Sequence, residues 1–122
     1  MANDFKRFTK PDVGTSTGAS ADAVYTVPAG SGSSALESIV IGITLANKTA
    51  SGITASVFLD NYDATNDVYI IKDATIPAGA SLEVMSGNKL VLQGNGTAND
   101  ALRISSSAAS ALDATVSVLE DV

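Results

Sequence analysis

Two stretches of the chain alternate apolar and polar residues with particular regularity, residues 36–46 and residues 53–60. Successive side chains of a β-strand point to opposite faces of a sheet, so a period of two predicts a strand with one buried face. We therefore predict a strand in each stretch, and weaker alternation near the C-terminus predicts two more. The core residues predicted from these strands are Ile39, Ile41, Ile43, Val57, Leu59, Leu102, Ile104, Val116 and Val118.

Short apolar runs continue through the chain after residue 22, and Gly, Pro, Asn and Asp separate them. No segment has the 3.6-residue period of a long amphipathic helix. Turn-forming residues at 50–52 and 86–88 predict hairpins between the strands that flank them. The predicted strands are residues 23–27, 36–46, 53–60, 68–72, 82–85, 89–92, 101–106 and 114–120.

Eight short strands divided by turns predict an all-β fold, a single antiparallel β-sandwich of the jelly-roll kind. A parallel α/β sheet would need crossover helices, and the sequence contains no pattern for them. The Ala-rich residues 106–112 leave one alternative open, a single helical turn. A chain of 122 residues has the size for one core.

The first 22 residues differ from the remainder, because two Phe and three basic residues precede a small, polar stretch at 14–21. We predict an N-terminal arm over residues 1–22 and a sandwich domain over residues 23–122. Aromatic and Arg side chains carry much of the energy of protein interfaces. The predicted partner-binding residues of the arm are Phe5, Lys6, Arg7, Phe8 and Lys10. The alternative is that the arm folds back as an edge strand of its own sandwich.

Composition narrows the possible functions, because the chain has no His and no Cys. Ser-His-Asp and Cys-His triads, disulfides and ordinary zinc sites are thereby excluded. No carboxylate pair or Gly-rich loop has the spacing of a known catalytic or phosphate-binding motif. We therefore predict no catalytic residues, no cofactor and no enzymatic activity. The formal charge of −6 disfavours nucleic acid and anionic membranes as partners.

No run of about 18 apolar residues is present to span a bilayer, and the N-terminus lacks the apolar segment of a secretory signal. We expect a soluble protein made in a cytoplasm. The acidic stretch from Asp60 to Asp67 offers oxygen ligands for Ca²⁺ but lacks the spacing and the closing Glu of an EF-hand. A solvated loop between two strands is therefore preferred, and no metal is predicted.

Several motifs together resemble a known class of protein. They are Phe5-Lys-Arg-Phe-Thr9, Val13-Gly-Thr-Ser16, Val24-Tyr-Thr-Val-Pro-Ala-Gly30, Ala74-Thr-Ile-Pro-Ala-Gly-Ala-Ser-Leu82 and Ala114-Thr-Val-Ser-Val-Leu-Glu120. The sequence resembles small virion structural proteins of tailed bacteriophages over nearly its whole length. The resemblance implies a non-enzymatic β-sandwich that decorates or cements a capsid, or that attaches at the neck or tail.

The function expected on these grounds is that of a capsid decoration or cement subunit in the virion, made in the host bacterium. Its expected partners are the major capsid protein or another virion protein, together with further copies of itself in a homo-oligomer. One alternative is a component of the neck, tail or fibre. Another, from a different class, is a β-sandwich module that binds a host glycan, although only six aromatic residues are present for sugar stacking.

Overall fold

The computed structural model describes residues 3–27, 37–60, 67–85, 89–94 and 99–121. In these ranges the chain forms nine strands and one short 3₁₀ segment, and no α-helix. The elements are β1 (Asn3–Lys10), η1 (Gly18–Ser20), β2 (Asp22–Thr26), β3 (Glu37–Asn47), β4 (Ile53–Asp60), β5 (Val68–Ile76), β6 (Ser81–Glu83), β7 (Leu90–Gln93), β8 (Ala101–Ser106) and β9 (Leu112–Asp121).

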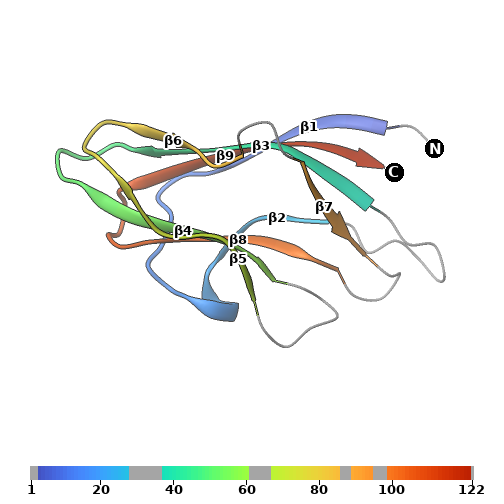
Figure 1. Cartoon of the computed structure of the whole chain (residues 1–122), viewed down its shortest axis with the longest axis horizontal. Coiled ribbons are helices and arrows are strands. Elements are labelled where there is room, and N and C mark those ends of the chain that lie inside the picture. Colours follow the sequence, from blue (N-terminus) through green and yellow to red (C-terminus); the bar gives the residue numbers. More distant parts are fainter. Residues whose placement is uncertain (1–2, 28–36, 61–66, 86–88, 95–98, 122) are drawn as a thin grey trace.

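The strands form two antiparallel sheets that pack face to face as the two layers of a sandwich (Figure 1). Sheet A has the order β1-β9-β3, and both β6 and β7 pair with the far side of β3. Sheet B has the order β2-β8-β4-β5. The predicted antiparallel β-sandwich is confirmed, and the interleaving of early and late strands in both sheets is that of a jelly roll.

All eight predicted strands are present, and β4 and β8 have the predicted bounds. Residues 106–112 form no helix, and residues 109 and 110 lie in a turn. The two predicted hairpins are wrong. The chain crosses from sheet A to sheet B between β3 and β4, which do not pair with each other. Strands β6 and β7 each pair with β3 rather than with one another, and residues 86–88 lie outside the described part of the chain.

The buried side chain of Asn47 holds the crossing from β3 to β4 in place. Its Nδ2 donates to the carbonyl oxygens of Ser51 at 2.8 Å and Ile76 at 3.1 Å, and its Oδ1 accepts the Thr49 N–H at 3.0 Å. One amide therefore ties the β3–β4 connection to the end of β5. A hairpin has no need of such a group, because its own ladder satisfies the backbone.

The core lies between the two sheets. Six of the nine predicted core residues are fully buried, whereas Ile39 and Leu59 are half-buried and Ile41 is 38% exposed. The confirmed residues are Ile43, Val57, Leu102, Ile104, Val116 and Val118.

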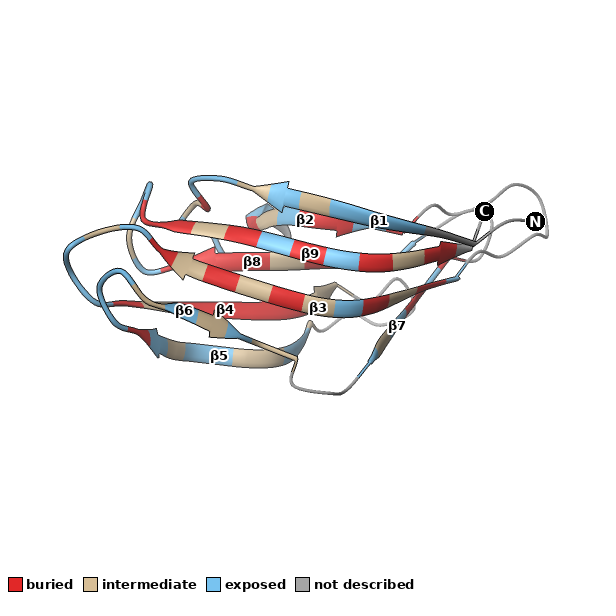
Figure 2. Cartoon of the chain, turned by 90° about the horizontal axis from the view of Figure 1, so that it is seen from above, coloured by how far each residue is buried: buried red, intermediate tan, exposed pale blue. Residues whose placement is uncertain are grey.

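A β-bulge explains why the prediction for Ile41 is wrong. The pairing of β3 with β9 shifts register between Val40 and Gly42, so Val40 and Ile43 both point into the core. An extra residue in one strand shifts the alternation of side chains by one position. Residues that would face the core without the bulge then face solvent on one side of it. Figure 2 shows the interruption as an exposed segment within β3, between buried positions on either side.

Residues 3–10 form an edge strand of sheet A rather than a separate segment. Strand β1 pairs with β9 along its whole length, from Asn3 opposite Asp121 to Lys10 opposite Ala114. This is the edge-strand alternative that the sequence left open. The remainder of the proposed arm, from residue 11 to residue 21, carries the chain from sheet A to sheet B.

Candidate functional site

An apolar row crosses the outer face of sheet A. Phe5 of β1 lies opposite Leu119 of β9, which lies opposite Ile39 of β3, which in turn lies opposite Val91 of β7. Residues paired in this way share one face of the sheet. Phe5 is 78% exposed and Val91 is 52% exposed, and Ile41 at the bulge extends the apolar surface beside Ile39. We call Phe5, Leu119, Ile39, Val91 and Ile41 the apolar row.

Polar residues border the apolar row on both sides. On one side, Arg7 lies opposite Ser117, which lies opposite Gly42. On the other, Glu37 lies opposite Gln93, and both are exposed. An apolar strip with a polar rim is the usual anatomy of a protein interface.

The predicted arm residues separate into two groups, because successive side chains of β1 alternate between the faces. Phe5 and Arg7 are exposed on the outer face of sheet A, and Arg7 makes no ion pair with a described residue. Lys6, Phe8 and Lys10 lie opposite Val118, Val116 and Ala114, which point into the core.

Two residues of the inward group, Phe8 and Lys6, contact their own domain. The Phe8 ring lies 4.6 Å from that of Tyr25 in β2, so it joins the two sheets. Lys6 Nζ lies 2.8 Å from Glu120 Oε1. Of the five residues predicted to bind a partner, Phe5 and Arg7 are the two that lie exposed on the outer face of sheet A.

A buried polar network lies beneath this edge of the sandwich. The Glu120 side chain is 4% exposed; its Oε2 accepts the Tyr25 hydroxyl at 2.6 Å, and Ser38 Oγ lies 2.7 Å from the same hydroxyl. Burial raises the pKa of Tyr25, as does its bond to Glu120, so the phenol stays protonated and donates. Burial alone would raise the pKa of Glu120, but the bonds from Lys6 and Tyr25 outweigh it and hold that pKa below its ordinary value. The network is internally satisfied and therefore structural.

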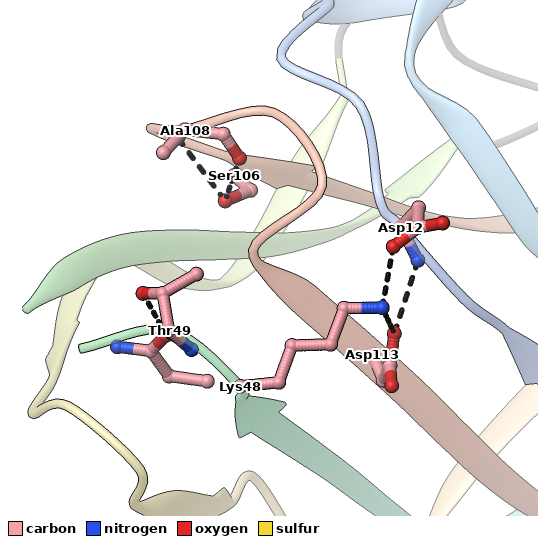
Figure 3. Close-up of polar contacts among 7 residues, drawn as sticks. Asp12, Lys48, Thr49, Ser106, Ala108 and Asp113 are labelled. Carbon is pink, nitrogen blue, oxygen red and sulfur yellow. Dashed lines mark hydrogen bonds and ion pairs between the residues drawn. The ribbon is translucent and has the colours of Figure 1, made fainter. Parts of the chain in front are cut away.

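A second polar cluster lies where the chain leaves β1 (Figure 3). Lys48 Nζ lies 2.9 Å from Asp113 Oδ1 and also contacts Asp12, whose backbone N–H donates to Asp113 Oδ1 at 3.0 Å. The bond from Lys48 lowers the pKa of Asp113. The three charged side chains pair with one another near solvent, and they join the segment after β1 and the β3–β4 connection to the start of β9.

Metal and membrane features are absent from the described residues. No group of three His, Cys, Asp or Glu side chains there is placed to hold a metal ion. The acidic stretch considered for Ca²⁺ has residues 61–66 outside the described ranges. No helix in the described part of the chain is long and apolar enough to cross a membrane.

Comparison with known proteins identifies no relative: no family model, no curated protein and no solved structure matches the chain. The apolar row is therefore assessed on its geometry. Sequence reasoning found Phe5 and Arg7 from their residue types, but it missed Leu119 and Val91. Neither is unusual in its own strand, and only the register of four strands brings them into line with Phe5.

Proposed function

We propose that this chain is a non-enzymatic virion structural protein, a capsid decoration or cement subunit that docks through the outer face of sheet A. The observation that carries the proposal is the apolar row, of which Phe5, Ile41 and Val91 are exposed, although the core between the sheets is complete without it. The sequence motifs that resemble tailed-phage virion proteins supply the class of assembly.

The chemistry of the row defines the partner surface that would fit it. Phe5 and Val91 offer apolar contact area at the two ends of the row, and Arg7 beside Phe5 offers a positive charge. A complementary surface has an apolar strip with a carboxylate near one end. We assign that surface to the capsid shell, since a chain with a formal charge of −6 repels further copies of itself at long range.

The face of sheet A, rather than its edge, is the docking element. The edge strand β1 carries Arg7 and Lys10, and charged side chains on an edge strand oppose the addition of another strand. Docking by strand addition is therefore disfavoured, and face-to-face contact remains.

Binding of the purified chain to undecorated capsid shells, measured by co-sedimentation, tests the proposal. The double variant Phe5→Ser, Val91→Thr removes the exposed ends of the row and should weaken binding by at least about tenfold, as expected for interface anchors. The matched control is Thr115→Ser, at an exposed position further along the same face. Both proteins should melt close to the wild type, because their substituted side chains are exposed.

Two results would contradict the proposal. One is equal binding by the double variant and the wild type. The other is an oligomer of the free chain that the double variant dissociates, with no binding to shells, which would assign the row to self-association. Electron cryo-microscopy of the intact particle then separates decoration, with hundreds of copies, from a neck or tail position, with a ring of few.

A further inference from the structure

The outer face of sheet B contains a hollow of about 260 Å³. Strands β4, β5 and β8 form it together with the segment that leads from β1 to β2. It lies on the opposite side of the sandwich from the apolar row, since the row is on sheet A (Figure 1). Ligand sites for drug-sized molecules are commonly about 300–1,000 Å³, so this hollow suits a single small ring.

Hydroxyl groups dominate its lining, since seven of the eleven residues are Ser or Thr. The hydroxyls of Thr15, Thr17, Thr54 and Ser105 make no hydrogen bond with any described residue. Every fully enclosed side-chain polar atom in the described ranges has a partner. The unpaired hydroxyls are therefore open to the hollow, where each can donate one hydrogen bond and accept others.

The two charges at the hollow cancel. Lys72 Nζ lies 3.5 Å from Asp73 Oδ2, and both side chains are exposed. A cation paired with a carboxylate favours neither an anionic nor a cationic ligand. The overall charge of −6 further disfavours phosphates, sulfates and acidic sugars.

An aromatic surface adjoins the hydroxyls. The Phe58 ring, buried although it faces outward from sheet B, lies 5.2 Å from the ring of Tyr69, which is 43% exposed. Aromatic rings pack against the C–H faces of apolar or amphipathic groups. Hydroxyl donors and acceptors beside an exposed aromatic ring are complementary to a sugar ring, which has hydroxyls at its rim and C–H groups on its faces.

The walls are held in place before any ligand binds. Ser56 Oγ accepts the Asp73 N–H at 2.9 Å, where β4 and β5 shift register. Thr54 N–H donates to Ser107 Oγ at 2.9 Å, and Ser106 N–H donates to Gly14 O at 3.1 Å. These bonds join all the elements that surround the hollow, and a preorganised site loses less entropy on binding.

We infer that this hollow binds a neutral pyranose, as a free sugar or as the terminal unit of a glycan. The inference goes beyond the proposed docking function and does not depend on it. A free sugar and the terminal unit of a glycan share one chemistry, an uncharged ring with several hydroxyls. They differ at the anomeric oxygen.

The test is a titration of the isotope-labelled full chain, followed by heteronuclear NMR. The probes are glucose, galactose, mannose and N-acetylglucosamine, the methyl glycosides of each, and inorganic phosphate. At least one neutral sugar should produce saturable shifts at Thr54, Tyr69 and Ser105. Binding of a methyl glycoside as tightly as the free sugar assigns the hollow to glycan termini, and binding of the free sugar alone assigns it to a free sugar.

Matched variants locate the site. Thr54→Val and Ser105→Ala each remove one hydroxyl and should weaken binding by about fivefold, the value of one ordinary hydrogen bond. The control Thr115→Val removes a hydroxyl from the outer face of sheet A and should bind sugar as the wild type does. The inference is overturned if no sugar produces shifts up to about 100 mM, if phosphate alone does, or if the Thr54 and Ser105 variants bind sugar unchanged.

Discussion

The replacement Tyr25→Phe isolates one hydroxyl at the centre of the buried network. In the wild type that hydroxyl donates to Glu120 Oε2 at 2.6 Å and lies 2.7 Å from Ser38 Oγ. The replacement keeps the ring that packs on Phe8 and removes only the oxygen. Glu120 then keeps its bond to Lys6 but loses a donor in a site where its side chain is 4% exposed.

The expected cost follows from the charge of the acceptor. A hydrogen bond to a charged group contributes about 1.5–3 kcal/mol, and a buried acceptor left without its donor adds a desolvation penalty. We therefore expect a loss of about 2–3 kcal/mol, which corresponds to a decrease in Tm of roughly 6–12 °C for a domain of this size. The matched control is Tyr69→Phe, whose hydroxyl bonds to no described residue and whose side chain is 43% exposed. It should change Tm by less than about 2 °C.

The pH dependence of the loss gives a second, independent signature. The pKa of Glu120 is held below its ordinary value of 4.5 in the folded protein. A carboxylate with a lowered folded-state pKa contributes stability that is fully present above the unfolded pKa and is lost as the pH falls through the folded pKa. Without the Tyr25 hydroxyl the folded pKa of Glu120 rises. The difference in stability between wild type and Tyr25→Phe should therefore be largest near neutral pH and shrink below pH 4.5.

Thermal unfolding followed by circular dichroism between pH 3 and pH 7 measures both effects, with the pH range chosen about the carboxyl pKa. The reasoning fails if Tyr25→Phe and Tyr69→Phe melt together at pH 7. It also fails if the cost of Tyr25→Phe is the same at both ends of the range, because the acceptor would then not be the carboxylate.

Five further substitutions test the fold by urea unfolding. Ile43→Ala should lower the free energy of unfolding by about 2–4 kcal/mol because Ile43 is fully buried, whereas Ile41→Ala should lower it by less than about 1 kcal/mol. Equal losses would contradict the bulge in β3. Asn47→Ala should lower the free energy of unfolding by about 2–3 kcal/mol, since the two carbonyl oxygens lose the donor that joins them. A loss below about 0.5 kcal/mol would show that the β3–β4 connection does not depend on Asn47. Phe8→Ala should lower the free energy of unfolding by about 2–3 kcal/mol, and Phe5→Ala should lower it by less than about 0.5 kcal/mol. The reverse order would mean that the opposite face of β1 packs on the core.

The sequence predicted most strands because their inward positions are apolar at every second residue. It offered β1 as an edge strand only as an alternative, since the inward residues there are Lys6, Phe8 and Lys10, and the two Phe are three positions apart. A lysine that meets a buried carboxylate at the opposite end of the chain has no local signature. The tertiary partner, rather than the strand itself, makes the inward position suitable for a charge.

The bulge and the hollow could not be predicted for a different reason. Alternation in residues 36–46 continues through Ile41 without interruption, and only the pairing with β9 shows where an extra residue is accommodated. The hollow combines Thr15 with Thr54 and Ser105, each of which is unremarkable in its own segment. Phe58 is buried on the face that alternation assigns to solvent, because Tyr69 of the neighbouring strand lies against it.

The pairing of β1 with β9 has a consequence for the order of folding. Lys6 and Glu120 are separated by 114 positions, and β9 is also the central strand between β1 and β3. During synthesis, Phe5 and Phe8 emerge before β9 and have no ladder to join until β9 has left the ribosome. Contacts at such long sequence separation slow folding. Strand β1 therefore cannot take its place in sheet A until β9 has been made, and its lysines and arginine keep the segment polar until then.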